Sequence, residues 1–353
     1  MYSRSLFPVI LGISMLGLFG FSQSASAAPY TLTNSPGDGT VTVGVDGFGA
    51  FGSSVGSDST DATYDPVGAG APDDTSFESA MAIRMSTTGG TRAFLTSGDI
   101  GGSGGLTNPT VTGSSTSGTS SFSFAPLDFT LSQTLTPLLS GSSQTGSTLT
   151  QTYTITNPSA STVSFELIRY LDGDLQFDGS IIDGGGRLIA PDGTEILFET
   201  DTASGTSTST TFVGITGEGG TEPATNRYEV DSFSGLRSRI ITGTALDNTI
   251  TGDGGDSDQF IDVAAGYDVT LALRNTFSLG PGGSIVYVTK TIFGSGAPED
   301  VGGNPVGGEL LPIDTTALVI AGIQSGALWA LPTLGAVVGT GLGLFYFQIK
   351  RKQ

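Results

Sequence analysis

Two Asp-rich loops hold the carboxylates whose spacing could support chemistry. The first acidic group follows an expected strand and comprises Asp172, Asp174, Asp178 and Asp183. The second acidic group lies in or just after the run 252–258 and comprises Asp253, Asp256, Asp258 and Asp262. Carboxylates in flexible Gly-rich loops suit Ca²⁺, which takes roughly six to eight oxygen ligands. We therefore expect Ca²⁺ at one or both groups.

Neither group matches an EF-hand, because neither has that loop's spacing or its closing Glu. The second group is similar to the Gly- and Asp-rich calcium repeats of exported proteins, but it occurs once rather than in tandem. Asp and Gly are also ordinary turn-forming residues. A plain turn and a cation site are thus alternative interpretations of both groups.

The same carboxylates could serve as the acid and base of a glycosidase, which needs two carboxyl groups roughly 5–10 Å apart. The candidate pairs combine Asp172 or Asp174 with Glu195 or Glu199. Sugar-cleaving clefts usually stack sugar rings on aromatic side chains, and the single Trp lies near the C-terminus, at position 329. Its absence from the rest of the chain weighs against a hydrolase, while Phe and Tyr leave room for a lectin-like site.

The sequence contains no His and no Cys. Catalytic triads with a His base, His-ligated zinc and thiolate chemistry are therefore excluded, and so are disulfides. Among common catalytic arrangements only paired carboxylates or Lys and Tyr chemistry are left, and we assign no catalytic residue.

The charge is strongly acidic, with a formal net charge of −20 and 55 Gly among the 353 residues. Between Ala28 and Pro312 there are 32 acidic and 9 basic side chains. Such a body repels nucleic acid and favours divalent cations, so we expect no nucleic-acid partner. Solubility of an exported protein is the simpler explanation of the same charge.

The run 47–52 matches a dinucleotide-binding fingerprint by letter and follows an expected strand. No helical pattern follows it, so we interpret it as a Gly-rich turn.

Both ends of the chain have the composition of membrane-targeting segments. Residues 1–27 combine Arg4, an apolar run and a small-residue cleavage motif, which predicts a signal peptide cut between Ala27 and Ala28. Ala327–Phe347 is apolar and, as a helix, would span roughly 31 Å, close to the thickness of a bilayer core. The basic tip, Lys350, Arg351 and Lys352, predicts a stop-transfer signal with the N-terminal bulk outside the cell.

Gly335, Gly339 and Gly343 fall on one face of this expected helix and could allow two helices to pack closely, although membrane helices are often Gly-rich. The run 310–318, the helix and the basic end together resemble the sorting tails of PEP-CTERM-type surface proteins and their archaeal counterparts. This resemblance covers about residues 308–353 and lacks the Pro-Glu-Pro triplet of the bacterial class. It implies that a sortase-like membrane enzyme removes the helix and passes the protein to the envelope.

The body has the period-two pattern of antiparallel strands, as at Val163, Phe165 and Leu167. We expect an all-β protein with a large antiparallel β-sandwich, including strands at 40–45, 80–85, 91–96 and 236–242, and long loops at 52–77 and 101–121. The expected organisation is a signal peptide (1–27), a Gly/Ser/Thr-rich β segment (28–118), the sandwich (119–293), a stalk (294–314), a sorting segment (315–326), the membrane helix (327–349) and the basic tip (350–353).

These features together predict a protein displayed at the cell surface, with a structural or adhesive role and with envelope or extracellular-matrix components as partners. The alternative is a surface-displayed carbohydrate-binding module with glycan partners. A glycoside hydrolase is a second alternative, which the sequence supports less.

Overall fold

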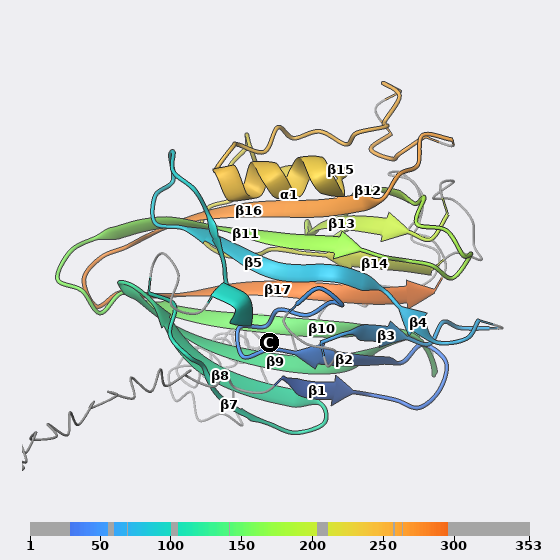
Figure 1. Cartoon of the computed structure of the whole chain (residues 1–353), viewed down its shortest axis with the longest axis horizontal. Helices are drawn as coiled ribbons and strands as arrows, with labels where there is room; N and C mark the ends of the chain where they lie inside the picture. Colours follow the sequence, from blue (N-terminus) through green and yellow to red (C-terminus); the bar gives the residue numbers. More distant parts are fainter. Residues whose placement is uncertain are drawn as a thin grey trace, which may run out of the picture.

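The computed structural model describes residues 29–55, 60–68, 70–99, 105–140, 142–202, 211–256, 258–262 and 264–295. Within these ranges the chain forms antiparallel β-sheets stacked on one another, with one short α-helix on the outside (Figure 1). The expected antiparallel β-architecture is therefore confirmed. No helix in the described ranges is long and apolar enough to cross a membrane. The expected signal peptide, stalk, sorting segment, membrane helix and basic tip lie outside the described residues, apart from the start of the stalk.

The largest sheet has eight strands in the order β12-β13-β14-β17-β10-β9-β8-β7. Its centre is the long antiparallel ladder of β9, β10 and β17, in which Tyr153 of β10 lies opposite Leu131 and Tyr287. The strands are β7 (Thr110–Gly113), β8 (Ser117–Phe124), β9 (Leu127–Ser140), β10 (Ser143–Thr156), β12 (Gly184–Ile189), β13 (Glu195–Thr200), β14 (Thr211–Ile215) and β17 (Ser284–Ser295).

A five-stranded sheet in the order β15-β16-β11-β5-β6 faces it. A four-stranded sheet in the order β1-β2-β3-β4 also packs on the eight-stranded sheet, with Leu32 and Val43 in one apolar cluster with Leu135 of β9 and Leu149 of β10. The strands of the five-stranded sheet are β5 (Ser76–Arg84), β6 (Ala93–Phe94), β11 (Val163–Gly173), β15 (Tyr228–Ser232) and β16 (Val269–Leu279). Those of the smaller sheet are β1 (Tyr30–Thr33), β2 (Val41–Val45), β3 (Ala62–Tyr64) and β4 (Asp73–Asp74).

The main core lies between the eight- and five-stranded sheets. Along β9, buried and exposed residues alternate from Leu127 to Leu135, as a strand with one covered face requires. By contrast β11 is buried on both faces, because the sandwich core covers one side and helix α1 the other. Phe165 of β11 stacks on Phe277 of β16 with ring centroids 4.8 Å apart, and these rings belong to the same apolar cluster as Tyr287 of the opposite sheet.

Helix α1 (Phe233–Thr242) replaces the strand expected at 236–242, so that prediction was wrong. Leu236 and Ile240, four residues apart, are its buried side chains and pack on the alanines of the five-stranded sheet. The helix ends at Gly243, whose left-handed conformation (φ 81°) directs its N–H back to the carbonyls of Arg239 and Ile240. A run of three turns with two buried residues is too short for its period to be distinguished from that of a strand.

The described part of the segment expected at 28–118 forms the four-stranded sheet and also contributes β5, β6 and β7 to the two larger sheets. The expected hairpin at 80–96 is present as β5 and β6, and β5 pairs directly with β11. The expected long loops contain short strands, β3 and β4 within 52–77 and β7 with part of β8 within 101–121. Strands this short carry too few alternating residues to stand out from a Gly/Ser/Thr-rich sequence.

A buried ion cluster connects strands β5, β11 and β16 of the five-stranded sheet with the β5–β6 loop and helix α1. The Glu166 carboxylate of β11 accepts from Arg84 Nη2 and Arg92 Nε, both at 2.7 Å, and from Arg274 Nε at 2.6 Å. Arg92 also donates to the carbonyls of Ile240 and Thr244 at the C-terminal end of α1. Burial opposes ionisation of Glu166, but the arginines, with Arg92 first, hold its pKa below the ordinary value.

We expect Glu166→Gln to lower the free energy of unfolding by about 3 kcal/mol or more, because three buried guanidinium groups would lose their shared carboxylate. Urea unfolding of the full chain measures this. The control is Ser164→Ala, an exposed position on the same strand. A loss below about 1 kcal/mol would show that the cluster does not hold these elements together.

Candidate functional site

The structure brings carboxyl groups from both sheets into one buried cluster. Asp172 lies near the end of β11 and Glu199 on β13, while Asp183 immediately precedes β12. Each of these three residues is 1 % exposed. Half-buried Asp268, which immediately precedes β16, lies close enough to affect the ionisation of all three. We call Asp172, Asp183 and Glu199 the inter-sheet cluster.

Glycines make room for these side chains. The Glu199 carboxyl group lies directly against Gly173, where a Cβ atom would collide with it. On β12 the residue opposite Glu199 is Gly185, where a Cβ atom would meet the Phe198 carbonyl of β13. The packing of Glu199 between the two sheets therefore depends on glycine at position 173.

The inter-sheet cluster contains a carboxyl–carboxyl contact. Asp183 and Glu199 are within hydrogen-bonding reach of each other. One oxygen of each, Asp183 Oδ1 and Glu199 Oε2, is buried with no donor from any other group. Two ionised carboxylates cannot hydrogen-bond to each other, whereas a protonated one can donate to an ionised one. The geometry therefore favours a proton held between the two groups.

Burial is the main electrostatic influence on this cluster. It raises the pKa of Asp172 to about 9, with further upward shifts from Asp268 and Glu78. Burial likewise raises the pKa of Asp183 to about 8, although its hydrogen bond with Glu199 opposes the shift. The pKa of Glu199 is raised well above its ordinary value by burial and then by Asp183.

The other two members of the first acidic group, Asp174 and Asp178, are less buried than Asp172 and Asp183. Asp174 is half-buried and Asp178 is exposed, in the loop that follows β11. Asp201, which the sequence did not single out, accepts hydrogen bonds from the backbone N–H groups of Phe177 (2.8 Å) and Asp178 (3.4 Å). Asp201, directly after β13, thus holds this loop in place. Backbone N–H groups, rather than a cation, satisfy the Asp201 carboxylate.

The second acidic group forms a compact site in the loop between helix α1 and β16. Asp253, Asp256 and Asp258 each place one carboxylate oxygen within 4.8 Å of the others, and no other such trio occurs among the described residues. The fourth member, Asp262, lies directly against Gly254 of the same loop. Oxygen atoms this close from three side chains match the requirement of a small cation for several hard ligands.

This loop is positioned by its own turns and by the edge of the eight-stranded sheet. Gly252 and Gly255 adopt left-handed conformations, both with φ 91°. The Ile261 N–H donates to the Gly185 carbonyl at 2.8 Å, and the Arg187 N–H donates to the Gln259 carbonyl at 2.9 Å. One carboxylate oxygen, Asp253 Oδ1, is buried without a donor. The backbone therefore holds these acidic side chains together, and it also donates to Asp256 and Asp258 through the N–H groups of Asp258 and Phe260.

The glycosidase pairs are not arranged for acid–base chemistry. Glu195 is held between Arg187 (2.6 Å) and Arg227 (2.7 Å), so both of its oxygens accept from guanidinium groups. Glu199 and Asp172 are buried in the inter-sheet cluster, and Asp174 lies at its periphery. A general acid must reach its substrate, so the arrangement does not support this reaction.

The Gly-rich run 47–52 is a turn, as predicted, with Gly49 and Gly52 at positive φ. It surrounds a buried carboxylate that the sequence analysis missed. One oxygen of Asp46 accepts from the N–H groups of Phe48 (2.8 Å) and Ala50 (2.9 Å), and the other accepts from Ser97 (2.9 Å). Burial still raises the pKa of Asp46 to about 6. The alternation of the preceding strand did not reveal that this Asp points inward.

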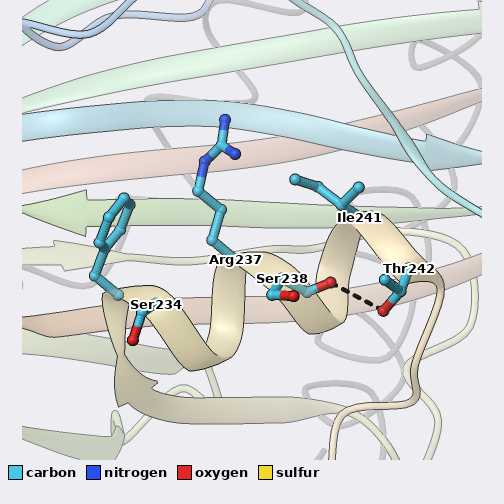
Figure 2. Close-up of a pocket in the computed structure, with 6 residues that line it drawn as sticks. Ser234, Arg237, Ser238, Ile241 and Thr242 are labelled. Atoms are coloured by element: carbon cyan, nitrogen blue, oxygen red, sulfur yellow. Dashed lines mark hydrogen bonds between the residues drawn. The ribbon is translucent and has the colours of Figure 1, made fainter.

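An open pocket lies on the outer side of helix α1. Figure 2 shows the side chains that line it, which are Phe233, Ser234, Arg237, Ser238, Ile241 and Thr242. Arg237 is its ionisable residue, and that guanidinium is paired with Glu78 of β5. The pocket therefore presents hydroxyl and apolar groups but no free charge for chemistry.

No family model matches the chain, and no curated protein matches it. Among solved structures it compares with one from Escherichia coli K12 described as a "putative aldose 1-epimerase", at 14% sequence identity and a TM-score of 0.34. The comparison covers 75% of this chain and 99% of that chain. A TM-score this low assigns neither a fold family nor an activity to this chain.

The structural or adhesive role expected from the sequence is corrected, because the comparison gives it no support.

We expect Gly173→Ala to lower the free energy of unfolding by about 1–3 kcal/mol, because the added methyl group would displace the Glu199 carboxyl group. Thermal and urea unfolding of the full chain measure the effect. Gly280→Ala is the control, since a Cβ atom there meets no atom within 4 Å. Equal stability of the two variants would contradict the packing of Glu199 on Gly173.

Proposed function

We propose that this protein binds a divalent cation, with Ca²⁺ as the best match, in the loop that carries Asp253, Asp256 and Asp258. The observation that supports this most strongly is the convergence of three carboxylate oxygens within 4.8 Å of one another. Asp262, which lies against the same loop at Gly254, is placed to add a further oxygen. Backbone carbonyls and water would complete a coordination shell of roughly six to eight oxygens.

The charge distribution supports the same assignment. The nine Lys and Arg side chains between residues 29 and 295 have other contacts: Arg84, Arg92 and Arg274 with Glu166, Arg187 and Arg227 with Glu195, Arg237 with Glu78, Arg239 with Asp231, Lys290 with Glu218, and Arg169 with Ser79 and Thr291. Together with the three carboxylates that meet in this loop, the acidic surplus of the chain favours a bound cation. We assign the cation to this group alone, and not to the inter-sheet cluster.

The proposed setting is the outside of the cell. The composition of residues 1–27 supports export, and the apolar run 327–347 with its basic end supports attachment to the membrane, as a lasting anchor or as a sorting tail. Extracellular calcium modules bind with modest affinity, in the range of about 10⁻⁴–10⁻³ M. A single exposed Asp-rich loop is consistent with an affinity of that order.

We expect Ca²⁺ in the millimolar range to raise the melting midpoint of the full chain by about 3 °C or more, because the cation binds only the folded loop. Isothermal titration calorimetry should show one site. The double variant Asp256→Asn with Asp258→Asn should lose both effects. The control is Asp247→Asn, an exposed position outside the loop. Binding that persists unchanged in the double variant would contradict the proposal.

We also expect the mature protein isolated from its own cells to begin at Ala28, because a small residue at Ala27 suits signal peptidase. Intact-mass spectrometry measures this directly. The same mass reports whether the C-terminal segment is retained as an anchor or removed as a sorting tail. A protein that retains residues 1–27 would contradict export by a cleaved signal.

A further inference from the structure

The inter-sheet cluster has no part in the proposed cation site and needs an explanation of its own. Asp172 belongs to the five-stranded sheet, whereas Glu199 belongs to the eight-stranded sheet and Asp183 precedes its edge strand β12. These carboxyl groups therefore sit where the two layers meet. Any repulsion among them acts to separate β12 and β13 from β11.

The groups that face the cluster do not neutralise it. The ionisable neighbours on the surrounding elements are Glu78 on β5, Tyr170 on β11, Asp174 and Asp178 after β11, Asp201 after β13, Arg237 on α1, and Tyr267 and Asp268 before β16. Arg237 is the one cation among these neighbours, and its guanidinium is bound to Glu78. The cluster is thus surrounded almost entirely by other acids.

A proton can satisfy this arrangement without any further group. When Asp183 or Glu199 is protonated, its O–H can donate to the facing carboxylate, and the buried oxygens gain the donor that they otherwise lack. When both are ionised, two buried like charges face each other with no cation between them. Protonation of one of the two carboxyl groups therefore favours contact between the sheets, and ionisation of both disfavours it.

We propose that the inter-sheet cluster is a proton-dependent latch, which holds β12 and β13 against β11 while Asp183 and Glu199 share a proton and loosens that edge when both ionise.

The direction of the pH effect follows from the raised pKa values. The folded protein binds more protons than the unfolded chain between an ordinary carboxyl pKa of about 4 and the folded values of about 8 for Asp183 and about 9 for Asp172. Stability is therefore greatest at low pH within this window and falls as pH rises through it. The pKa values of Asp46, Asp74 and Asp201 are raised only to about 6, so these groups act below that pH.

Because the sequence has no His and no Cys, few side chains titrate between about pH 6 and pH 8. No side chain with an ordinary pKa between about 6 and 8 occurs in the sequence, so proton uptake there reports on perturbed groups. Burial, rather than a neighbouring base, is what moves the carboxyl groups into this range.

The test is the melting midpoint of the full chain between about pH 6 and pH 9, with a chelator present so that the cation loop is empty. The midpoint should fall by several degrees as pH rises. Hydrogen exchange, corrected for its intrinsic pH dependence, should show faster opening of β12 and β13 at the upper end. Glu199→Gln should flatten the profile and melt higher than the wild type near pH 9, because its amide can donate to Asp183.

Two further variants keep the result interpretable. Asp128→Asn, at an exposed position on β9, should leave the pH profile unchanged. If Glu199→Gln does not fold, Asp183→Asn tests the same contact from the other side. A wild-type midpoint that is flat or rises between about pH 6 and pH 9 overturns the latch. So does a Ca²⁺-induced rise near pH 9 in the Asp256→Asn, Asp258→Asn variant, because a cation would then occupy the cluster.

Discussion

The shortage of cations constrains this protein more than any other feature of its chemistry. The sequence has 33 acidic and 13 basic side chains, and only nine of the basic ones lie in the β-sandwich between residues 29 and 295. Three arginines surround the single carboxylate of Glu166, and two more hold Glu195. Once these clusters are formed, few positive charges are left for the remaining buried acids.

One other way of meeting this shortage is observed in the structure, and two more are proposed. Backbone N–H groups satisfy the carboxylates of Asp46 and Asp201. A shared proton suits the pair Asp183 and Glu199, which lies between the sheets, and a bound cation suits the loop trio beginning at Asp253. Each solution depends on local architecture: a Gly-rich turn around Asp46, a glycine at position 173 against Glu199, and a loop with left-handed glycines. The acidic composition thus affects both how the sandwich is held together and what it can bind.

Much of the fold could be predicted from the sequence, because strands with one covered face alternate visibly, as in β9. Helix α1 could not, since its two buried residues, Leu236 and Ile240, fit a strand nearly as well. The second acidic group was predicted as a unit because its members lie in one loop. The inter-sheet cluster was predicted only in part, because Asp172, Asp183 and Glu199 meet through pairing between distant strands, and sequence spacing does not encode that register.

The central claim is that buried carboxyl groups between the sheets remain protonated in the folded protein at neutral pH. Infrared spectroscopy of the full chain, with a chelator present, observes this directly through the carbonyl stretch of protonated carboxyl groups. This band should be present near pH 7 and should weaken in the double variant Asp183→Asn with Glu199→Gln. A wild-type spectrum in which the band is absent near pH 7 and appears only below about pH 5, where ordinary carboxylates protonate, would contradict it.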